Sequence, residues 1–217
     1  MVTELLPPLP LNLRGLFPSI RHDIIDLQHG DFMSQLPEWI QRARSHWRYR
    51  GQERPSFAEV PKESQESVWD YPRPPRIESD SRSVRVFWGD LKIAESTQTL
   101  RVLETASPPT FYVPATDVQT ALLSQQQGTS FCEWKGAATY WLITASSGTT
   151  LANAVWSYDR PLPGFEAIAE HFAFYPGKLH CEVDGIQVKP QPGNLYGGWV
   201  TPEIVGPMKG SPGTGSW

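Results

Sequence analysis

Four residues in the aromatic-rich part of the chain could carry proton-transfer chemistry: Glu104, Lys135, Tyr158 and His171. Glu104 ends an alternating segment beside Leu103, and a carboxylate next to a buried strand is costly without a partner. An ammonium group among aromatic rings is disfavoured by desolvation and favoured by a nearby carboxylate. We therefore expect Glu104 and Lys135 to be partners in a cleft, with the tyrosine and the histidine as candidate proton carriers.

Each of these residues also has an ordinary structural explanation. Glu104 could cap a loop amide, and Lys135 could be a surface lysine whose stem packs on apolar atoms. His171 could be a core histidine in an apolar helix. Cys132 has the character of a small buried hydrophobe more than of a nucleophile. The residues alone leave these alternatives open.

Five further residues could hold a ligand: Arg101, Tyr112, Tyr140, Trp141 and Trp156. The tryptophans could stack on an aromatic or cationic ligand, or pack in the core. The tyrosine hydroxyls need partners if buried and could orient a carbonyl or hydroxyl group. Arg101 could clamp an anion or form a salt bridge at a strand edge. Because side chains alternate along a strand, one of Tyr140 and Trp141 should face the cleft and the other the core.

Motifs for metals and cofactors are missing from the sequence. The two cysteines, Cys132 and Cys181, do not form a C-x-x-C pair, and metal-ligand spacing is absent. No P-loop, G-x-G-x-x-G, H-E-x-x-H or G-x-S-x-G pattern is present. We expect neither a metal nor a cofactor.

Antiparallel strands are predicted to position these side chains. Alternation of period two predicts strands over 83–88, 91–95, 98–104, 110–113, 137–145, 150–158, 178–183 and 186–189. Helical spacing predicts short helices over 34–50, from Thr116 or Asp117 through Leu123, and over 165–174. This pattern is typical of a mainly β or α+β fold.

The chain divides into four predicted parts. They are an N-terminal extension with part of a short helix (1–45), a Pro-rich wrapping connector (46–82), a β domain (83–190) and a Gly/Pro-rich C-terminal tail (191–217).

Composition narrows the class of protein. The 217 residues include 19 Lys+Arg and 23 Asp+Glu, for a formal net charge of −4. The cations are scattered, so we expect no nucleic-acid partner. No apolar run approaches the ~20 residues that span a bilayer, so we expect no membrane partner, and the N-terminal prolines do not fit a signal peptide. These features predict a cytoplasmic protein whose partner is a small-molecule ligand or substrate; its oligomeric state stays open, a homodimer among the options.

Several motifs occur in a characteristic order. They are Leu103-Glu104-Thr105 with Pro108-Pro109, Tyr112 with Pro114, Cys132-x-x-Lys135-Gly136, Tyr140-Trp141, Ala154-x-Trp156-x-Tyr158, Ile168-Ala169 and Phe174-Tyr175. This set closely resembles the domain of unknown function 427 family, and the resemblance covers about residues 46–217.

The resemblance implies a β-tent-like fold, in which two small antiparallel sheets pack at a steep angle around a cleft. Relatives with that architecture hold zinc through two C-x-x-C pairs, which this chain lacks, or bind small ligands in an aromatic cage. Trp141, Trp156 and Tyr158 could line such a cage. The family also carries a label that hints at nucleotidyl transfer.

The resulting functional hypothesis is a small-molecule-binding protein with an aromatic-lined cleft. It could be a cofactor-independent enzyme of isomerase, lyase or cyclase type that performs acid/base chemistry on an organic metabolite. The alternatives are a non-catalytic module that binds a ligand or peptide, and a nucleotidyltransferase-like activity.

Overall fold

The fold is mainly β, as predicted, in a computed structural model that describes residues 36–193, 195–215 and 217. The first elements are α1 (Glu38–Ser45), β1 (Glu66–Ser67), β2 (Arg76–Asp80), β3 (Val84–Trp88), β4 (Leu91–Ser96), β5 (Thr99–Glu104) and β6 (Ser107–Pro114). Next come β7 (Leu123–Cys132), β8 (Gly136–Thr144), β9 (Thr150–Ser157), β10 (His171–Phe174), β11 (His180–Val183), β12 (Ile186–Gln187), β13 (Lys189–Pro190), β14 (Trp199–Val200) and β15 (Ile204–Val205). Short 3₁₀ segments span Ala115–Asp117, Thr120–Leu122 and Glu166–Ile168.

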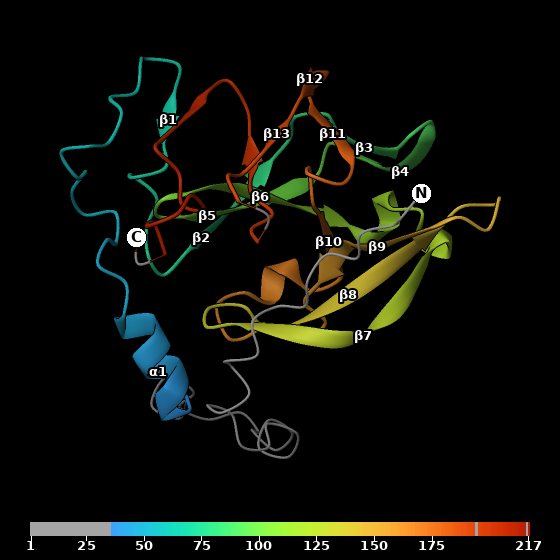
Figure 1. The fold of residues 1–217 in the computed structure, drawn as a ribbon, viewed down its shortest axis with the longest axis horizontal. Coiled ribbons are helices and arrows are strands. Elements are labelled where there is room, and N and C mark those ends of the chain that lie inside the picture. The colour runs from blue at the N-terminus through green and yellow to red at the C-terminus, as the bar shows by residue number, and fades with distance from the viewer. Residues whose placement is uncertain (1–35, 194, 216) are drawn as a thin grey trace, which may run out of the picture. The chain divides into compact units, whose positions relative to one another are not determined.

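Two antiparallel sheets make up most of the structure (Figure 1). The larger has seven strands in the order β2-β5-β6-β10-β9-β8-β7, and the smaller has four in the order β12-β11-β3-β4. Two small pairs complete the pattern: β1 with β15, which is parallel, and β13 with β14, which is antiparallel. The pair β1–β15 joins segments 66–67 and 204–205, which are far apart in the sequence.

Turn residues explain the hairpins that the sequence predicts. Strands β11 and β12 are joined by Asp184 and Gly185, whose φ values are +49° and +77°. Positive φ at both central positions is what a tight hairpin turn requires, and an Asp-Gly pair adopts it at low cost. Strands β3 and β4 turn at Gly89, where φ is +58°.

The predicted helix over 165–174 is wrong. Only Glu166–Ile168 forms a 3₁₀ turn, Glu170 has a φ of +56°, and the chain then continues as β10. Strand β10 pairs with both β6 and β9, so its backbone groups are satisfied within the sheet. Phe172 and Phe174 therefore lie on one face and Ala173 on the other. His171 is accordingly the first residue of a strand and does not lie in a helix.

Two other predicted helices are shorter than expected. The segment 34–50 is helical only in α1, which starts after Pro37 and buries Ile40; residues 34 and 35 lie outside the described residues. From Ala115 the chain makes two separate 3₁₀ turns and then enters β7. The polar sequence of β7 has no alternation that would have predicted a strand.

The two faces of the large sheet bury different residues. One face packs against the small sheet through an inter-sheet core, which includes Val84, Val86, Ile93, Phe111, Val113, Val155, Phe172, Phe174, Cys181 and Trp199. The opposite face carries a second cluster, here called the cavity-side cluster, of Val102, Tyr112, Trp134, Ala138, Trp156, Tyr158, Phe165, Ile168 and Ala173. Alternation along β6 and β9 produces this division, which places aromatic side chains of both strands on the face away from the small sheet.

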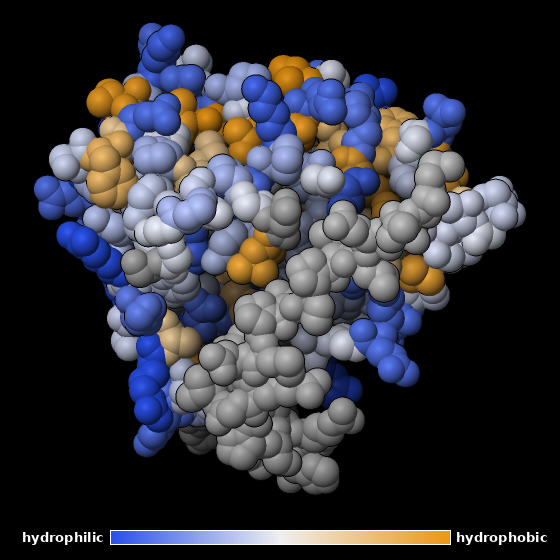
Figure 2. Space-filling model, viewed as in Figure 1, coloured by the Kyte–Doolittle hydropathy of each residue, from blue (hydrophilic) through white to orange (hydrophobic). Residues whose placement is uncertain are grey.

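The surface seen in Figure 2 is mainly hydrophilic, with scattered hydrophobic residues. Helix α1 has eight residues. Across the described ranges, no helix combines the length and the apolar character needed to cross a bilayer.

Candidate functional site

A cavity of about 330 Å³ lies over the cavity-side cluster. Strands β5 to β9 supply one part of its wall, and the wall is completed by residues from two distant segments, near 47 and near 191–209. Its lining residues are Trp47, Val102, Glu104, Ser107, Pro108, Thr110, Tyr112, Ser130, Phe131, Cys132, Glu133, Lys135, Tyr140, Trp156, Tyr158, Tyr175, Gln191, Leu195, Tyr196, Gly197 and Lys209. A volume at the lower end of the usual range for ligand pockets suits a small organic molecule.

Lys135 enters the cavity from the tight turn between β7 and β8. Gly136 has a φ of +99°, a conformation that favours glycine, and a Cβ there would lie 3.3 Å from the Leu162 side chain. The Lys135 carbonyl accepts a hydrogen bond from the Leu162 amide at 3.0 Å, which fixes the turn. The turn geometry thus explains why a glycine follows Lys135.

The Lys135 ammonium has neither an ion pair nor a hydrogen bond with any other described residue. Its Nζ lies 5.8 Å from the centroid of the Tyr158 ring. Burial lowers the pKa of Lys135, whereas the anionic forms of Cys132, Tyr158 and Tyr112, together with Glu104, act in the opposite direction, and the pKa is raised well above its ordinary value. Because the thiol and the phenols are uncharged at neutral pH, it is Glu104 that favours the positive charge of Lys135 there.

Neutral phenols surround that charge. Tyr112 is fully buried, and its hydroxyl has no partner with hydrogen-bond geometry among the described residues, although the neighbouring Trp156 side chain acts to lower its pKa. Burial raises the pKa of Tyr112 to about 12 and raises that of Tyr158 well above its ordinary value. Tyr140 shares a hydrogen bond of 2.7 Å with Ser130 Oγ. Both buried phenols therefore keep their protons at neutral pH.

Glu104 lines the same cavity as Lys135, but the ion pair it forms is with Arg73. Arg73 Nε donates to Glu104 Oε1 at 3.0 Å. The buried guanidinium also donates to three backbone carbonyls, those of Tyr49, Thr105 and Trp217, at 2.8–3.0 Å. No ion pair joins Glu104 to Lys135 within the described residues, although the Glu104 charge helps to raise the pKa of Lys135. Arg73 thus fixes the carboxylate at the cavity wall.

The cavity lining also includes three of the predicted ligand-binding residues, Tyr112, Tyr140 and Trp156. Trp141 is on the opposite face: it packs edge-on against Phe172 in the inter-sheet core, with ring centroids 5.4 Å apart. Its indole nitrogen donates to Ser157 Oγ at 2.9 Å. Of the adjacent pair, Tyr140 therefore faces the cavity and Trp141 the core.

Arg101 and His171 do not line the cavity. Arg101 is held by three carboxylates, those of Glu66, Glu78 and Asp80, at 3.1–3.2 Å. His171 Nδ1 lies 2.7 Å from the Ala169 carbonyl oxygen. The structure therefore brings Glu104, Lys135 and Tyr158 together with Tyr112, Tyr140 and Trp156, and leaves Arg101, Trp141 and His171 elsewhere.

Sequence reasoning missed Arg73, Lys209, Trp47 and Tyr196. Lys209 is 3% exposed and comes from the C-terminal segment; its Nζ lies 3.6 Å from the Trp47 ring centroid and 4.9 Å from that of Tyr196. A signal for Arg73 was the aromatic-rich stretch around it, WDYPRPPR. Lys209 had no comparable signal, since it is an isolated lysine in a Gly/Pro-rich tail.

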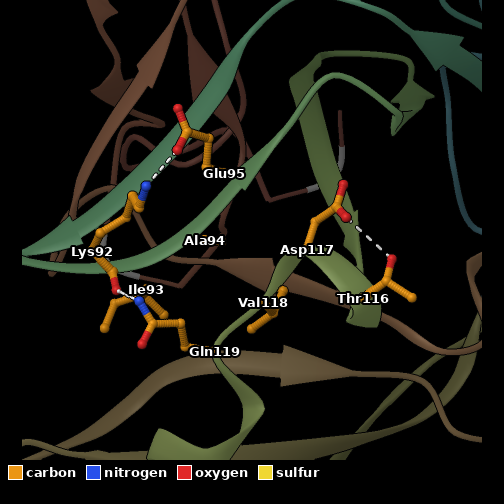
Figure 3. A pocket seen from close by; sticks show the side chains of 8 residues that line it. All are labelled: Lys92, Ile93, Ala94, Glu95, Thr116, Asp117, Val118 and Gln119. Atoms are coloured by element: carbon orange, nitrogen blue, oxygen red, sulfur yellow. Dashed lines mark hydrogen bonds and ion pairs between the residues drawn. The ribbon is translucent and has the colours of Figure 1, made fainter.

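A second hollow, of about 320 Å³, lies beside β4 (Figure 3). Its polar side chains satisfy one another. Lys92 pairs with Glu95, Thr116 Oγ1 donates to Asp117 Oδ1 at 3.2 Å, and Gln119 Nε2 donates to the Lys92 carbonyl at 2.6 Å. Because no aromatic residue lines it, we treat the larger, aromatic cavity as the candidate site.

Within the described ranges, no three His, Cys, Asp or Glu residues gather in an arrangement that could hold a metal ion. Cys132 lines the aromatic cavity, and burial raises the pKa of its thiol. The thiol is therefore protonated at neutral pH.

Comparison with known proteins identifies the family of the chain. No curated protein matches it. Residues 76–188, which are 113 of the 217, match a family described as a domain of unknown function, DUF427. The matched region runs from β2 to just beyond β12 and includes most of the strands that line the cavity, among them the positions of Glu104, Lys135 and Tyr158. The chain belongs to the DUF427 family.

Proposed function

We propose that the chain binds a small organic molecule in the aromatic cavity and performs acid/base chemistry on it without a cofactor. One observation carries this proposal: an ammonium, two buried phenols and a carboxylate line one cavity, and no hydrogen bond or ion pair joins Lys135 Nζ to another described residue. Buried polar groups are normally hydrogen-bonded, so unsatisfied ones in a cavity indicate that a ligand completes them.

The roles follow from the protonation states. Glu104 has one oxygen held by Arg73, which leaves the other as the candidate base. Lys135 and Tyr158 keep their protons at neutral pH and could donate hydrogen bonds to an oxygen on which negative charge develops. Donors fixed in place around such an oxygen stabilise a transition state strongly in a site that excludes water. The reaction class is then an isomerisation, elimination or cyclisation that begins with proton abstraction.

A non-catalytic binding module is the second candidate. The observation that favours it is the Arg73–Glu104 pair, because a carboxylate tied to a guanidinium has an evident structural role. In that case the rings of Trp156, Tyr140 and Tyr158 would hold the ligand, and removing the Glu104 charge would leave affinity unchanged.

Retention of metabolites on immobilised protein tests the first proposal. Wild type and Trp156→Ala would be exposed to the same metabolite extract, and retained molecules would be identified by mass spectrometry. Lys189→Met, which alters an exposed lysine outside the cavity, serves as the control. We expect the wild type and the control to retain a molecule that Trp156→Ala loses.

Incubation of that molecule with catalytic amounts of protein then separates the two candidates. Turnover that Glu104→Gln and Lys135→Met each reduce at least a hundredfold supports the acid/base proposal, in line with the usual contribution of a general acid or base. Binding without turnover, unaffected by Glu104→Gln, supports the binding module. Equal retention by Trp156→Ala would contradict both, and Mg²⁺-dependent retention of a nucleotide would favour the nucleotidyltransferase alternative.

A further inference from the structure

Lys209 is a buried cation without a counterion. Its side chain is almost wholly enclosed, yet no hydrogen bond or ion pair joins its Nζ to another residue in the part of the chain that the structure describes. Its Nζ lies over the rings of Trp47 and Tyr196. A cation–π contact offsets only a fraction of the cost of removing an ammonium from water.

The backbone holds Lys209 firmly in this position. Its amide donates to the Ala106 carbonyl at 2.7 Å, and its own carbonyl accepts from Gln191 Nε2 at 2.8 Å. The next residue, Gly210, has a φ of +129°, and a Cβ there would lie 1.7 Å from the Pro192 carbonyl oxygen. Only glycine fits that position, so the segment cannot easily shift Lys209 out of the cavity wall.

The carboxylates near Lys209 are each committed to other groups. Glu104 is paired with Arg73, and Glu133 Oε1 accepts the indole hydrogen of Trp47 at 2.6 Å. Arg44 adds a further positive charge beside Glu133, whose carbonyl oxygen it contacts at 2.7 Å. Positive charges therefore outnumber negative charges around the cavity, because neither Lys209 nor Lys135 has a carboxylate as an ion-pair partner among the described residues.

We infer that the ligand is a small organic anion, a carboxylate or a phosphate ester, whose charged group lies against Lys209 Nζ while its apolar body packs on the aromatic walls of the cavity. This inference rests on the proposed function, since it assigns the chemistry of the molecule that the cavity binds. An anion there supplies the missing counterion, whereas a cation would meet two ammonium groups. The Lys135 end of the cavity is left for the reacting part of the ligand.

Proton linkage gives the inference a measurable signature. Burial lowers the pKa of Lys209 to about 8, opposed by Glu104, Glu133 and Cys132 and reinforced by Arg73. At pH 8.5 more than half of the free protein therefore carries a neutral Lys209. An anion bound to Nζ raises this pKa, so binding takes up roughly half a proton or more per site at that pH.

Calorimetry with three probes tests the inference: phenylacetate, phenyl phosphate and the neutral isostere 2-phenylacetamide. We expect at least one anion to bind tenfold or more tightly than the amide, and the two anions distinguish a carboxylate site from a phosphate site. Titrations at pH 8.5 in buffers of different ionisation enthalpy should show proton uptake by the wild type. Lys209→Met should lose the preference for the anion and the proton uptake, while Lys189→Met retains both.

Each other result contradicts the inference. Equal affinity for the amide and the anions, with binding lost in Trp156→Ala, would leave the cavity as a ligand site and refute the anionic ligand alone. Anion binding by the wild type without proton uptake, together with the same anion affinity in Lys209→Met, would place the charged group away from Lys209. Binding of none of the three probes, together with no retained metabolite, would refute the inference and the proposed function together.

Discussion

Replacing Arg73 by methionine should destabilise the protein by about 3 kcal/mol or more. The Arg73 side chain is fully buried, and the Glu104 side chain is 18% exposed. Removing one partner of a buried ion pair typically costs about 3–5 kcal/mol, because the other charge stays buried without compensation. Partial exposure of Glu104 and the positive charge of Lys135 place the expected cost toward the lower end. The three carbonyls that lose a donor add to it, at about 1 kcal/mol for each hydrogen bond.

Urea unfolding followed by tryptophan fluorescence measures this loss. With a slope of about 2 kcal/mol per molar urea, a loss of about 3 kcal/mol lowers the midpoint by about 1.5 M, and the lost hydrogen bonds lower it further. Arg73→Lys should lose about half as much, because an ammonium could keep the pair with Glu104 but could not reach all three carbonyls.

The double variant provides the internal control. Glu104→Gln removes the charge that Arg73→Met leaves uncompensated, so the two changes together should cost at least 1 kcal/mol less than the sum of the single changes. A midpoint shift below about 0.5 M in Arg73→Met, or strict additivity in the cycle, would refute the view that Arg73 fixes Glu104 at the cavity wall.

Three further variants test the cavity wall. Gly197→Ala should destabilise the protein by about 1–3 kcal/mol and weaken ligand retention, since the new Cβ would lie 2.2 Å from the Trp156 ring. An unchanged urea midpoint together with unchanged retention would contradict the close packing of Gly197 on Trp156. Tyr112→Phe should change stability by less than about 1 kcal/mol, because the hydroxyl it removes is unpartnered, and a larger loss in the same assay would reveal a partner. The pKa of Lys209 is lowered to about 8 in the folded protein, so between pH 8 and the ordinary lysine pKa near 10.4 the unfolded chain binds more protons than the folded one. The free energy of unfolding of the wild type, relative to that of Lys209→Met, should therefore rise with pH across that window. A difference that stays constant or falls would disprove the lowered pKa.

Local signals were sufficient for the elements that are defined by their turns. Asp184-Gly185 predicts a hairpin because both residues tolerate positive φ, and the structure contains it. The segment 165–174 could not be assigned in this way, since its apolar residues fit helical spacing and the alternation of Phe172 and Phe174 equally well. What selects the strand is pairing with β6 and β9, which are distant in sequence.

The same distinction applies to the residues of the candidate site: those on periodic strands could be predicted, and those on irregular segments could not. Trp156 and Tyr158 could be placed on one face from alternation alone, since they are two residues apart in a predicted strand, and both line the cavity. Lys209 could not be placed, because its segment has no periodicity and reaches the cavity through a backbone bond to Ala106 and the packing of Trp47. Arg101 was predicted to bind a ligand, but its guanidinium forms ion pairs with acidic residues of β1 and β2. The sequence could not reveal these partners, because they lie on other strands.

A crystal structure of the protein with its retained metabolite would test whether the aromatic cavity is the ligand site. We expect the molecule to lie in this cavity, within hydrogen-bond distance of Lys135 Nζ and against the ring of Trp156. Density for the molecule at any other place on the protein, with the cavity filled by rearranged side chains, would contradict it.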